Sequence, residues 1–127
     1  MKRFRASYRV FILTALVSIC CLFPARRGSA HAILIEAVPA ANSKVAGPDI
    51  AIKLRFSSRI DPARSRLTLL LPDGGQRKLE IQKQESPDTL SSQAKGLSAG
   101  AYRLQWQVLA TDGHITRGEV PFEVISA

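Results

Sequence analysis

The chain has 127 residues, and most of its formal charge of +8 at pH 7 comes from one end. Residues 1–30 contain six of the 18 Lys and Arg residues and no acidic residue, so residues 31–127 carry 12 basic and 10 acidic side chains. That near balance excludes the strongly basic surface typical of a nucleic-acid-binding protein. Both cysteines and the only methionine also lie in residues 1–30, which excludes a disulfide and a sulfur ligand from the remainder.

Residues 1–30 have the pattern of a secretory signal peptide. Basic residues precede an apolar run of 14 residues, Val10 to Phe23, which is shorter than the roughly 20 residues needed to span a membrane. Small residues follow at Gly28 and Ala30. We expect cleavage after Ala30 and an exported mature domain of residues 31–127. Because "AHA" at residues 30–32 is also a small-x-small step, cleavage after Ala32 is the alternative.

The mature region predicts strands in chain order. Apolar and polar residues alternate in residues 50–56, which places Ile50, Ile52, Leu54 and Phe56 on one face. Residues 66–82 predict two strands joined by a turn at Pro72-Asp73-Gly74-Gly75. Two further strands are predicted within residues 96–110 and 119–125. The aromatic residues of the mature region all fall on predicted inward faces: Phe56, Tyr102, Trp106 and Phe122.

The remaining segments predict connections rather than helices. Residues 57–66 form a polar connection with room for one helical turn, and residues 84–96 form another with a short strand around Leu90. Pro121 lacks an N–H group, which favours an edge strand or an outward-facing position. About seven short strands in roughly 100 residues predict an all-β fold, either a two-sheet sandwich or a Greek-key barrel.

The chain has two histidines, and both fall where a Cu(II) site would need them. Cleavage after Ala30 would make His31 the first residue, so its α-amine and ring nitrogen could close a chelate ring on a metal. Asp112 and His114 stand at i and i+2, and on an extended segment both side chains point the same way. Together these residues would supply three nitrogens and one oxygen, a set that suits tetragonal Cu(II).

Each of these residues also has an ordinary structural interpretation. Asp112 and Gly113 form a common hairpin-turn pair, in which the aspartate caps the turn. His114 alone could be a solvated loop residue, and His31 could follow the cleavage site by chance. The chance interpretation weakens when both histidines are considered together.

Three long stretches resemble the CopC-type periplasmic copper-binding proteins. "HAILIEAVPAANSKV" is similar to the start of the mature family members, and "IKLRFSSRID" is similar to their L-x-F-S strand. The third stretch, residues 97–124, resembles a long C-terminal signature of the family. The residues that match this signature are Gly100, Tyr102, Trp106, Val108, Asp112, Gly113, His114, Gly118, Phe122 and Val124.

The resemblance implies an Ig-like fold of Greek-key type and one Cu(II) per chain, bound by His31, Asp112 and His114. It also implies a monomeric copper chaperone or buffer in periplasmic copper homeostasis or resistance, with an inner-membrane copper transport protein of the CopD type as partner. Ser58 stands where some members carry an acidic residue. The absence of Met and Cys from residues 31–127 argues against the Cu(I) site of the methionine-rich members.

Other functions remain open on the residues alone. One is a metal-free Ig-like interaction module that docks on a membrane partner. Another is a copper oxidase that uses an N-terminal histidine, but a substrate surface with exposed aromatic residues is not predicted. A Ser-His-Asp hydrolase would need a nucleophile motif that the sequence lacks. We therefore predict a binding protein rather than an enzyme.

Overall fold

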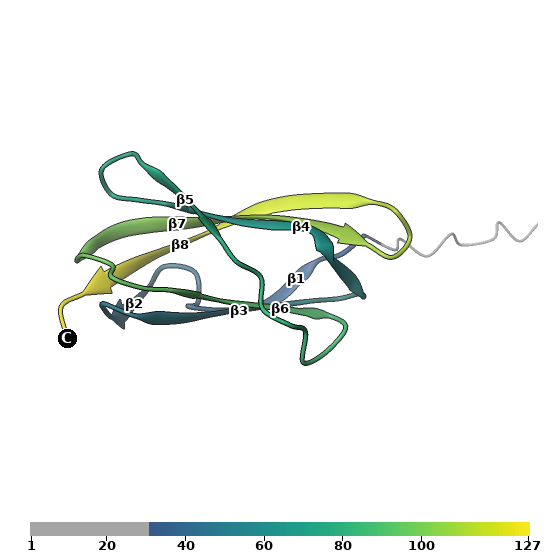
Figure 1. The fold of residues 1–127 in the computed structure, drawn as a ribbon, viewed down its shortest axis with the longest axis horizontal. Helices are drawn as coiled ribbons and strands as arrows, with labels where there is room; N and C mark the ends of the chain where they lie inside the picture. The colour runs from purple at the N-terminus through teal and green to yellow at the C-terminus, as the bar shows by residue number, and fades with distance from the viewer. Residues whose placement is uncertain (1–30) are drawn as a thin grey trace, which may run out of the picture.

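The computed structural model describes residues 31–127, and the expected signal peptide of residues 1–30 lies outside the described residues. Two sheets pack face to face, one with strand order β1-β3-β6 and the other with order β2-β8-β7-β4-β5 (Figure 1). The predicted all-β sandwich is confirmed, with eight strands rather than about seven. Their bounds are β1 (Leu34–Val38), β2 (Ser43–Ala46), β3 (Ile50–Phe56), β4 (Ile60–Leu70), β5 (Gln76–Leu79), β6 (Thr89–Ala94), β7 (Gly100–Ala110) and β8 (Ile115–Ile125).

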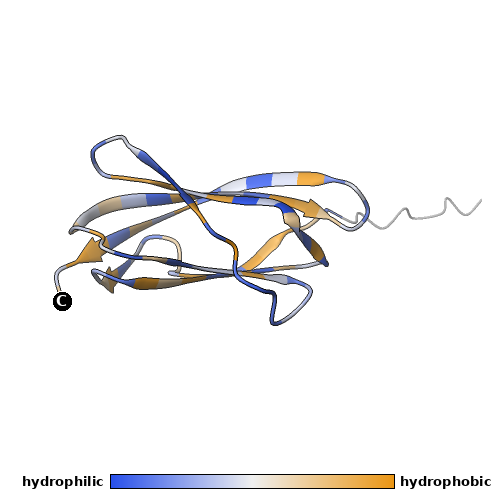
Figure 2. Ribbon diagram, viewed as in Figure 1, coloured by the Kyte–Doolittle hydropathy of each residue, from blue (hydrophilic) through white to orange (hydrophobic). Residues whose placement is uncertain are grey.

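The core lies between the two sheets and is built by the predicted alternation. Along β3, every second residue from Ile50 to Phe56 is buried, and hydrophobic and hydrophilic residues alternate along the strands in Figure 2. Each aromatic residue predicted to face inward is buried, and the Phe56 and Trp106 rings meet edge to face with centroids 5.1 Å apart. No helix that could cross a membrane occurs among residues 31–127.

The predicted polar connection at residues 57–66 is wrong over most of its length. β4 begins at Ile60, and Ile60 and Asp61 pair with the end of β7. The β4–β7 register then shifts between Asp61 and Arg66. Within this bulge the Ala63 N–H bonds to Asp61 Oδ1 at 3.0 Å, and the Ser65 hydroxyl donates to the Asp61 carbonyl at 2.6 Å. Because a bulge interrupts the period of two, the strand was hidden in the sequence pattern.

Pro121 occupies an interior strand but faces outward. β8 lies between β2 and β7, so the edge-strand alternative is wrong. The outward-facing alternative is confirmed, because the flanking residues Val120 and Phe122 are both buried. Parallel pairing of β2 with β8 begins only at Phe122, and the Pro121 carbonyl accepts the Asn42 N–H at 2.6 Å.

The fold brings two distant segments to one end of the sandwich. The start of β1 and the turn between β7 and β8 lie at the same end in Figure 1. β1 is anchored there by antiparallel pairing with β3, and the β7–β8 hairpin is the longest ladder of the larger sheet. Both predicted histidine positions therefore lie at this end.

Candidate metal centre

The β7–β8 turn is closed by its own backbone and by Asp112. The Ala110 N–H bonds to the His114 carbonyl, and the Gly113 N–H bonds to the Ala110 carbonyl, both at 2.9 Å. Gly113 has a φ of +88°, a conformation that glycine adopts without strain. Asp112 Oδ1 accepts the His114 N–H at 3.0 Å. Asp112 therefore does cap the turn, as its ordinary structural interpretation predicts.

The second carboxylate oxygen of Asp112 contacts the ring of His114. Asp112 Oδ2 lies 2.8 Å from His114 Nδ1, and the two side chains are 25% and 60% exposed, respectively. A hydrogen bond at Nδ1 orients an imidazole and leaves Nε2 available to a metal. Oδ1 of Asp112 caps the turn, and Oδ2 contacts the imidazole ring. Asp112 can therefore cap the turn and orient the His114 ring at the same time.

The same contacts lower the pKa of the Asp112 carboxyl group. The main cause is the hydrogen bond from the His114 backbone N–H, followed by the bond to the His114 side chain. Positive charge on His114 and on His31 acts in the same direction, while partial desolvation opposes it. Asp112 is therefore ionised at neutral pH and can accept a hydrogen bond or bind a cation.

Residues 31–33 are held against the end of β3 by Ser57. The Ser57 N–H bonds to the Ile33 carbonyl at 2.8 Å, and the Ser57 hydroxyl oxygen accepts the Ile33 N–H at 2.9 Å. The same hydroxyl lies 3.3 Å from the His31 carbonyl and donates to it. Ala32 is completely buried. The side chain of His31, on the opposite side of the chain, is left exposed.

The structure brings the three predicted site residues together. The rings of His31 and His114 meet edge to face, with centroids 4.7 Å apart and planes inclined by 71°. Within residues 31–127, no three His, Cys, Asp or Glu side chains already surround one point as a complete metal site. The bond between Asp112 and His114 Nδ1 agrees with this, because Asp112 points at the ring rather than at a shared centre.

Ser57 was not predicted to serve this site, and Ser58 offers it no exposed ligand. The role of Ser57 depends on contacts with residues far away in sequence, and the only local signal was its place beside Phe56 at a strand end. The Ser58 hydroxyl is buried without a hydrogen-bond partner. It stands where some family members were expected to carry an acidic residue, and in this chain it adds no donor to the centre.

Comparison with known proteins identifies the family. The sequence matches the CopC domain family model over residues 34–125. Protein YobA of Escherichia coli K12 is 32% identical over 98 residues, covering 75% of this chain and 79% of YobA. Copper resistance protein C of Xanthomonas campestris pv. juglandis is 26% identical over 121 residues, covering 89% of this chain and 94% of that protein.

A solved structure agrees over the same region. The crystal structure of CopC from Methylosinus trichosporium OB3b superposes with a TM-score of 0.70 and 33% identity, covering 76% of this chain and 95% of that one. The copper transport protein CutJ of Bacillus subtilis is 24% identical over 106 residues, which are 81% of this chain but only 20% of CutJ. These similarities give the chain a copper-related function, and the chain belongs to the CopC family.

Proposed function

We propose that the mature protein begins at His31 in the periplasm and carries one Cu(II) per chain as a monomeric copper chaperone or buffer. The observation that supports this most directly is the contact between the His31 and His114 rings at 4.7 Å. These are the only histidines of the chain. Because they meet at one exposed end of the sandwich, they are better explained as ligands of one metal ion than as two unrelated surface residues.

His31 and His114 supply the nitrogen ligands in this proposal. The α-amine and ring of His31 form a chelate once Ala30 has been removed. His114 binds through its ring, and Asp112 turns from His114 Nδ1 towards the metal to add an anionic oxygen. Three nitrogens and one oxygen suit Cu(II), which prefers tetragonal sites and stands at the top of the divalent affinity order. Asp112 becomes a direct ligand only if its bond to His114 Nδ1 opens.

The same residues disfavour Cu(I). Cu(I) is a soft ion that selects thiolate and thioether ligands, and residues 31–127 contain no Cys or Met. A single Cu(II) site of nitrogen and oxygen ligands also needs no catalytic group. We therefore assign a carrier role in copper homeostasis or resistance, without an enzymatic step.

Intact mass and copper titration test the proposal together. The exported protein should have the mass of residues 31–127, and one equivalent of Cu(II) should saturate it with a nitrogen-rich EPR signature. A mature chain that begins at Ile33 would lack His31 and would contradict the proposed site. Failure to bind Cu(II) at all would favour the metal-free interaction module instead.

A membrane copper transporter is the proposed partner. CutJ supports this, since a CopC-like region forms only a fifth of that copper transport protein. Where the region is a separate chain, as proposed here, it would have to dock on an inner-membrane protein of the CopD type. Co-purification with such a protein from solubilised membranes, lost when His31 and His114 are replaced, would support exchange of copper between them.

A further inference from the structure

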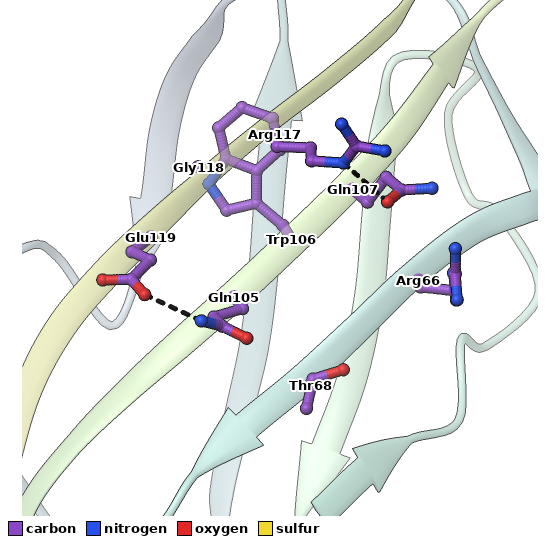
Figure 3. Close-up of a pocket in the computed structure, with 8 residues that line it drawn as sticks. All are labelled: Arg66, Thr68, Gln105, Trp106, Gln107, Arg117, Gly118 and Glu119. Carbon is purple, nitrogen blue, oxygen red and sulfur yellow. Dashed lines mark hydrogen bonds between the residues drawn. The ribbon is translucent and has the colours of Figure 1, made fainter. Parts of the chain in front are cut away.

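A groove crosses the outer face of the larger sheet (Figure 3), and one of its lining residues, Arg117, stands three residues after His114 in the chain. It has a volume of about 400 Å³ and runs over β4, β7 and β8. Its lining combines polar side chains with the apolar surface of Trp106 and Gly118. The polar side chains that line it are Arg66, Thr68, Gln105, Gln107, Arg117 and Glu119.

Two arginines without a carboxylate partner lie in one row across this groove. Arg66 pairs in register with Gln107, and Gln107 pairs with Arg117, so the three residues form a line across three strands. Arg117 Nε donates to Gln107 Oε1 at 2.8 Å (Figure 3). Within residues 31–127, neither Arg66 nor Arg117 forms an ion pair, although Arg55, Arg64 and Arg103 each do.

The one carboxylate in the groove is already engaged. Glu119 accepts the Gln105 side-chain N–H at 2.8 Å, and it also pairs with Arg103 at 3.6 Å. Arg66 and Arg117 are both exposed. The row therefore presents two guanidinium groups for which residues 31–127 supply no carboxylate counterion.

Exposed apolar residues connect this row to the candidate metal centre. Ile115 is 52% exposed, directly follows His114, and stands two residues before Arg117 on the same face of β8. Ile33 is 65% exposed and lies two residues after His31. Protein interfaces combine an apolar centre with a charged and polar rim. Ile115 thus lies on the same face of β8 as the arginine row and directly beside His114 in the chain.

We propose that the groove binds an extended acidic segment of the protein with which this chain exchanges copper. The inference rests on the proposed copper-carrier function. Carboxylates of the segment pair with Arg66 and Arg117, and the adjoining part covers Ile115. The backbones of Arg66 and Arg117 lie two strand spacings apart, about 10 Å. Carboxylates at i and i+2 of an extended chain are about 7 Å apart, and the flexible arginine side chains span the difference.

Guanidinium groups suit this role because their planar fork binds a carboxylate through two hydrogen bonds. Opposite charges also accelerate encounter between partners by about 10- to 1000-fold at low salt. Bound in the groove, the acidic segment would hold its copper ligands beside His114. The interface would thereby direct copper to one partner without contributing to the metal affinity.

The test follows Cu(II) transfer from the loaded mature domain to two acceptor peptides by stopped-flow absorbance. Both peptides carry a pair of histidines, preceded in one by glutamates at i and i+2 and in the other by glutamines. Transfer to the acidic peptide should be at least about 10-fold faster at low ionic strength, with the difference shrinking in high salt. In the double variant Arg66→Gln/Arg117→Gln, the preference should fall below about twofold, while Cu(II) affinity stays unchanged.

A matched control removes two charges elsewhere. Lys53 on β3 and Lys83 in the β5–β6 connection are exposed and lie outside the groove. The variant Lys53→Gln/Lys83→Gln should keep the preference for the acidic peptide. If both double variants lose it equally, net charge alone is responsible and the groove is not a binding site. Equal transfer rates to both peptides from the wild type would also overturn the proposal.

Two further measurements separate the groove from the copper function and from lipid binding. In metal-free protein, the acidic peptide should shift amide NMR signals of β4, β7 and β8. This measurement tests whether the groove binds the peptide, even if the protein does not bind Cu(II). Absence of such shifts would overturn the groove while leaving copper carriage intact. Arginine-dependent binding to phosphatidylglycerol vesicles, in place of the peptide, would identify a lipid surface and refute the protein partner.

Discussion

The hydroxyl of Ser57 donates a hydrogen bond to the carbonyl oxygen of His31 at 3.3 Å. The Ser57 hydroxyl oxygen also accepts the Ile33 N–H at 2.9 Å, so one side chain holds the backbone on both sides of the buried Ala32. All the hydrogen bonds of Ser57 with residues 31–33 are to backbone groups rather than to a histidine ring. Its contribution is to limit where His31 can lie relative to His114 before any metal is bound.

Replacing Ser57 by alanine should weaken Cu(II) binding without unfolding the domain. The substitution removes two hydrogen bonds to residues 31–33, so His31 must be ordered when copper binds. Loss of such supporting contacts typically lowers metal affinity by about 10- to 100-fold. Competitive Cu(II) titration measures the effect, and circular dichroism checks the fold.

Ser58→Ala is the matched control for that experiment. The Ser58 hydroxyl is buried without a hydrogen-bond partner, and removing such a group is neutral or stabilising. Cu(II) affinity should therefore stay at the wild-type value. Equal weakening in both variants would show that the loop as a whole, rather than the Ser57 hydroxyl, supports the site.

Substitutions at His114 and Asp112 should reduce Cu(II) affinity unequally. His114→Ala removes an imidazole, the better ligand for Cu(II), and should have the larger effect. Asp112→Asn retains an oxygen that can cap the turn but removes the negative charge, and should have the smaller effect. Both residues are exposed, so melting temperatures should change little. A wild-type Cu(II) affinity in folded His114→Ala would show that His114 is not a ligand.

Copper binding should be lost in mild acid because of the nitrogen ligands. Free imidazole and α-amine groups have pKa values of about 6.5 and about 7.7–8.0, and copper must displace their protons. The lowered pKa of Asp112, caused first by the His114 N–H, keeps its carboxylate ionised over this range. Cu(II) titrations from pH 7 to pH 4 should therefore show similar pH dependence in wild type and Asp112→Asn. Binding that persists unchanged to pH 3 would indicate carboxylate ligands.

The same lowered pKa has a defined consequence for the metal-free protein. A depressed carboxyl pKa stabilises the fold above the unfolded-state value of about 3.9. This contribution disappears as the pH falls through the folded-state pKa of Asp112. NMR titration of the carboxyl carbon should place that pKa below its ordinary value. In His114→Ala the pKa should rise only partway, because the backbone N–H bond remains.

Gly118→Ala should destabilise the domain through contact with Trp106. A Cβ atom at Gly118 would lie 2.6 Å from Cε2 of the indole ring, far inside van der Waals contact. Overpacking of this kind typically costs about 1–3 kcal/mol. Urea unfolding measures the loss, and Trp106→Phe should relieve part of it, since the smaller ring vacates space. Additive effects of the two substitutions would show that the backbone, rather than the ring, resists the methyl group.

Local sequence pattern predicted the parts of the fold that depend on neighbours in the chain. The alternation in β3 and β7 identified their buried faces, and the turn at Pro72–Gly75 is closed by the Leu71 N–H bonding to the Gly75 carbonyl at 2.9 Å. β2 has only four residues and pairs in parallel with β8. A strand so short has little periodicity of its own. Its partner β8 lies at the far end of the chain, so no local pattern predicts the pairing either.

The candidate site also combines a part that local sequence predicts with a part that depends on tertiary contacts. Asp112 and His114 could be paired from their spacing, because both belong to one hairpin. Proximity of His31 to His114 depends on how the two sheets pack; the sequence suggested it only through the complementary metal ligands that the two histidines offer and through the resemblance to CopC proteins. The support from Ser57 and the bond between Asp112 and the ring depend on side-chain positions that no spacing rule describes.

The position of His31 at the start of the mature chain can be tested by adding a single residue before it. The added residue leaves the His31 imidazole and the strands in place but converts its α-amine into an amide, a much weaker donor. If the amine is a ligand, Cu(II) affinity should fall by at least the roughly 10- to 100-fold lost with supporting contacts, and the EPR signature should change. The comparison uses protein that begins at His31 and protein with one extra glycine, at equal copper loading. Identical affinity and identical EPR spectra would mean that copper does not use the amine, and that the placement of His31 behind Ala30 has no role in binding.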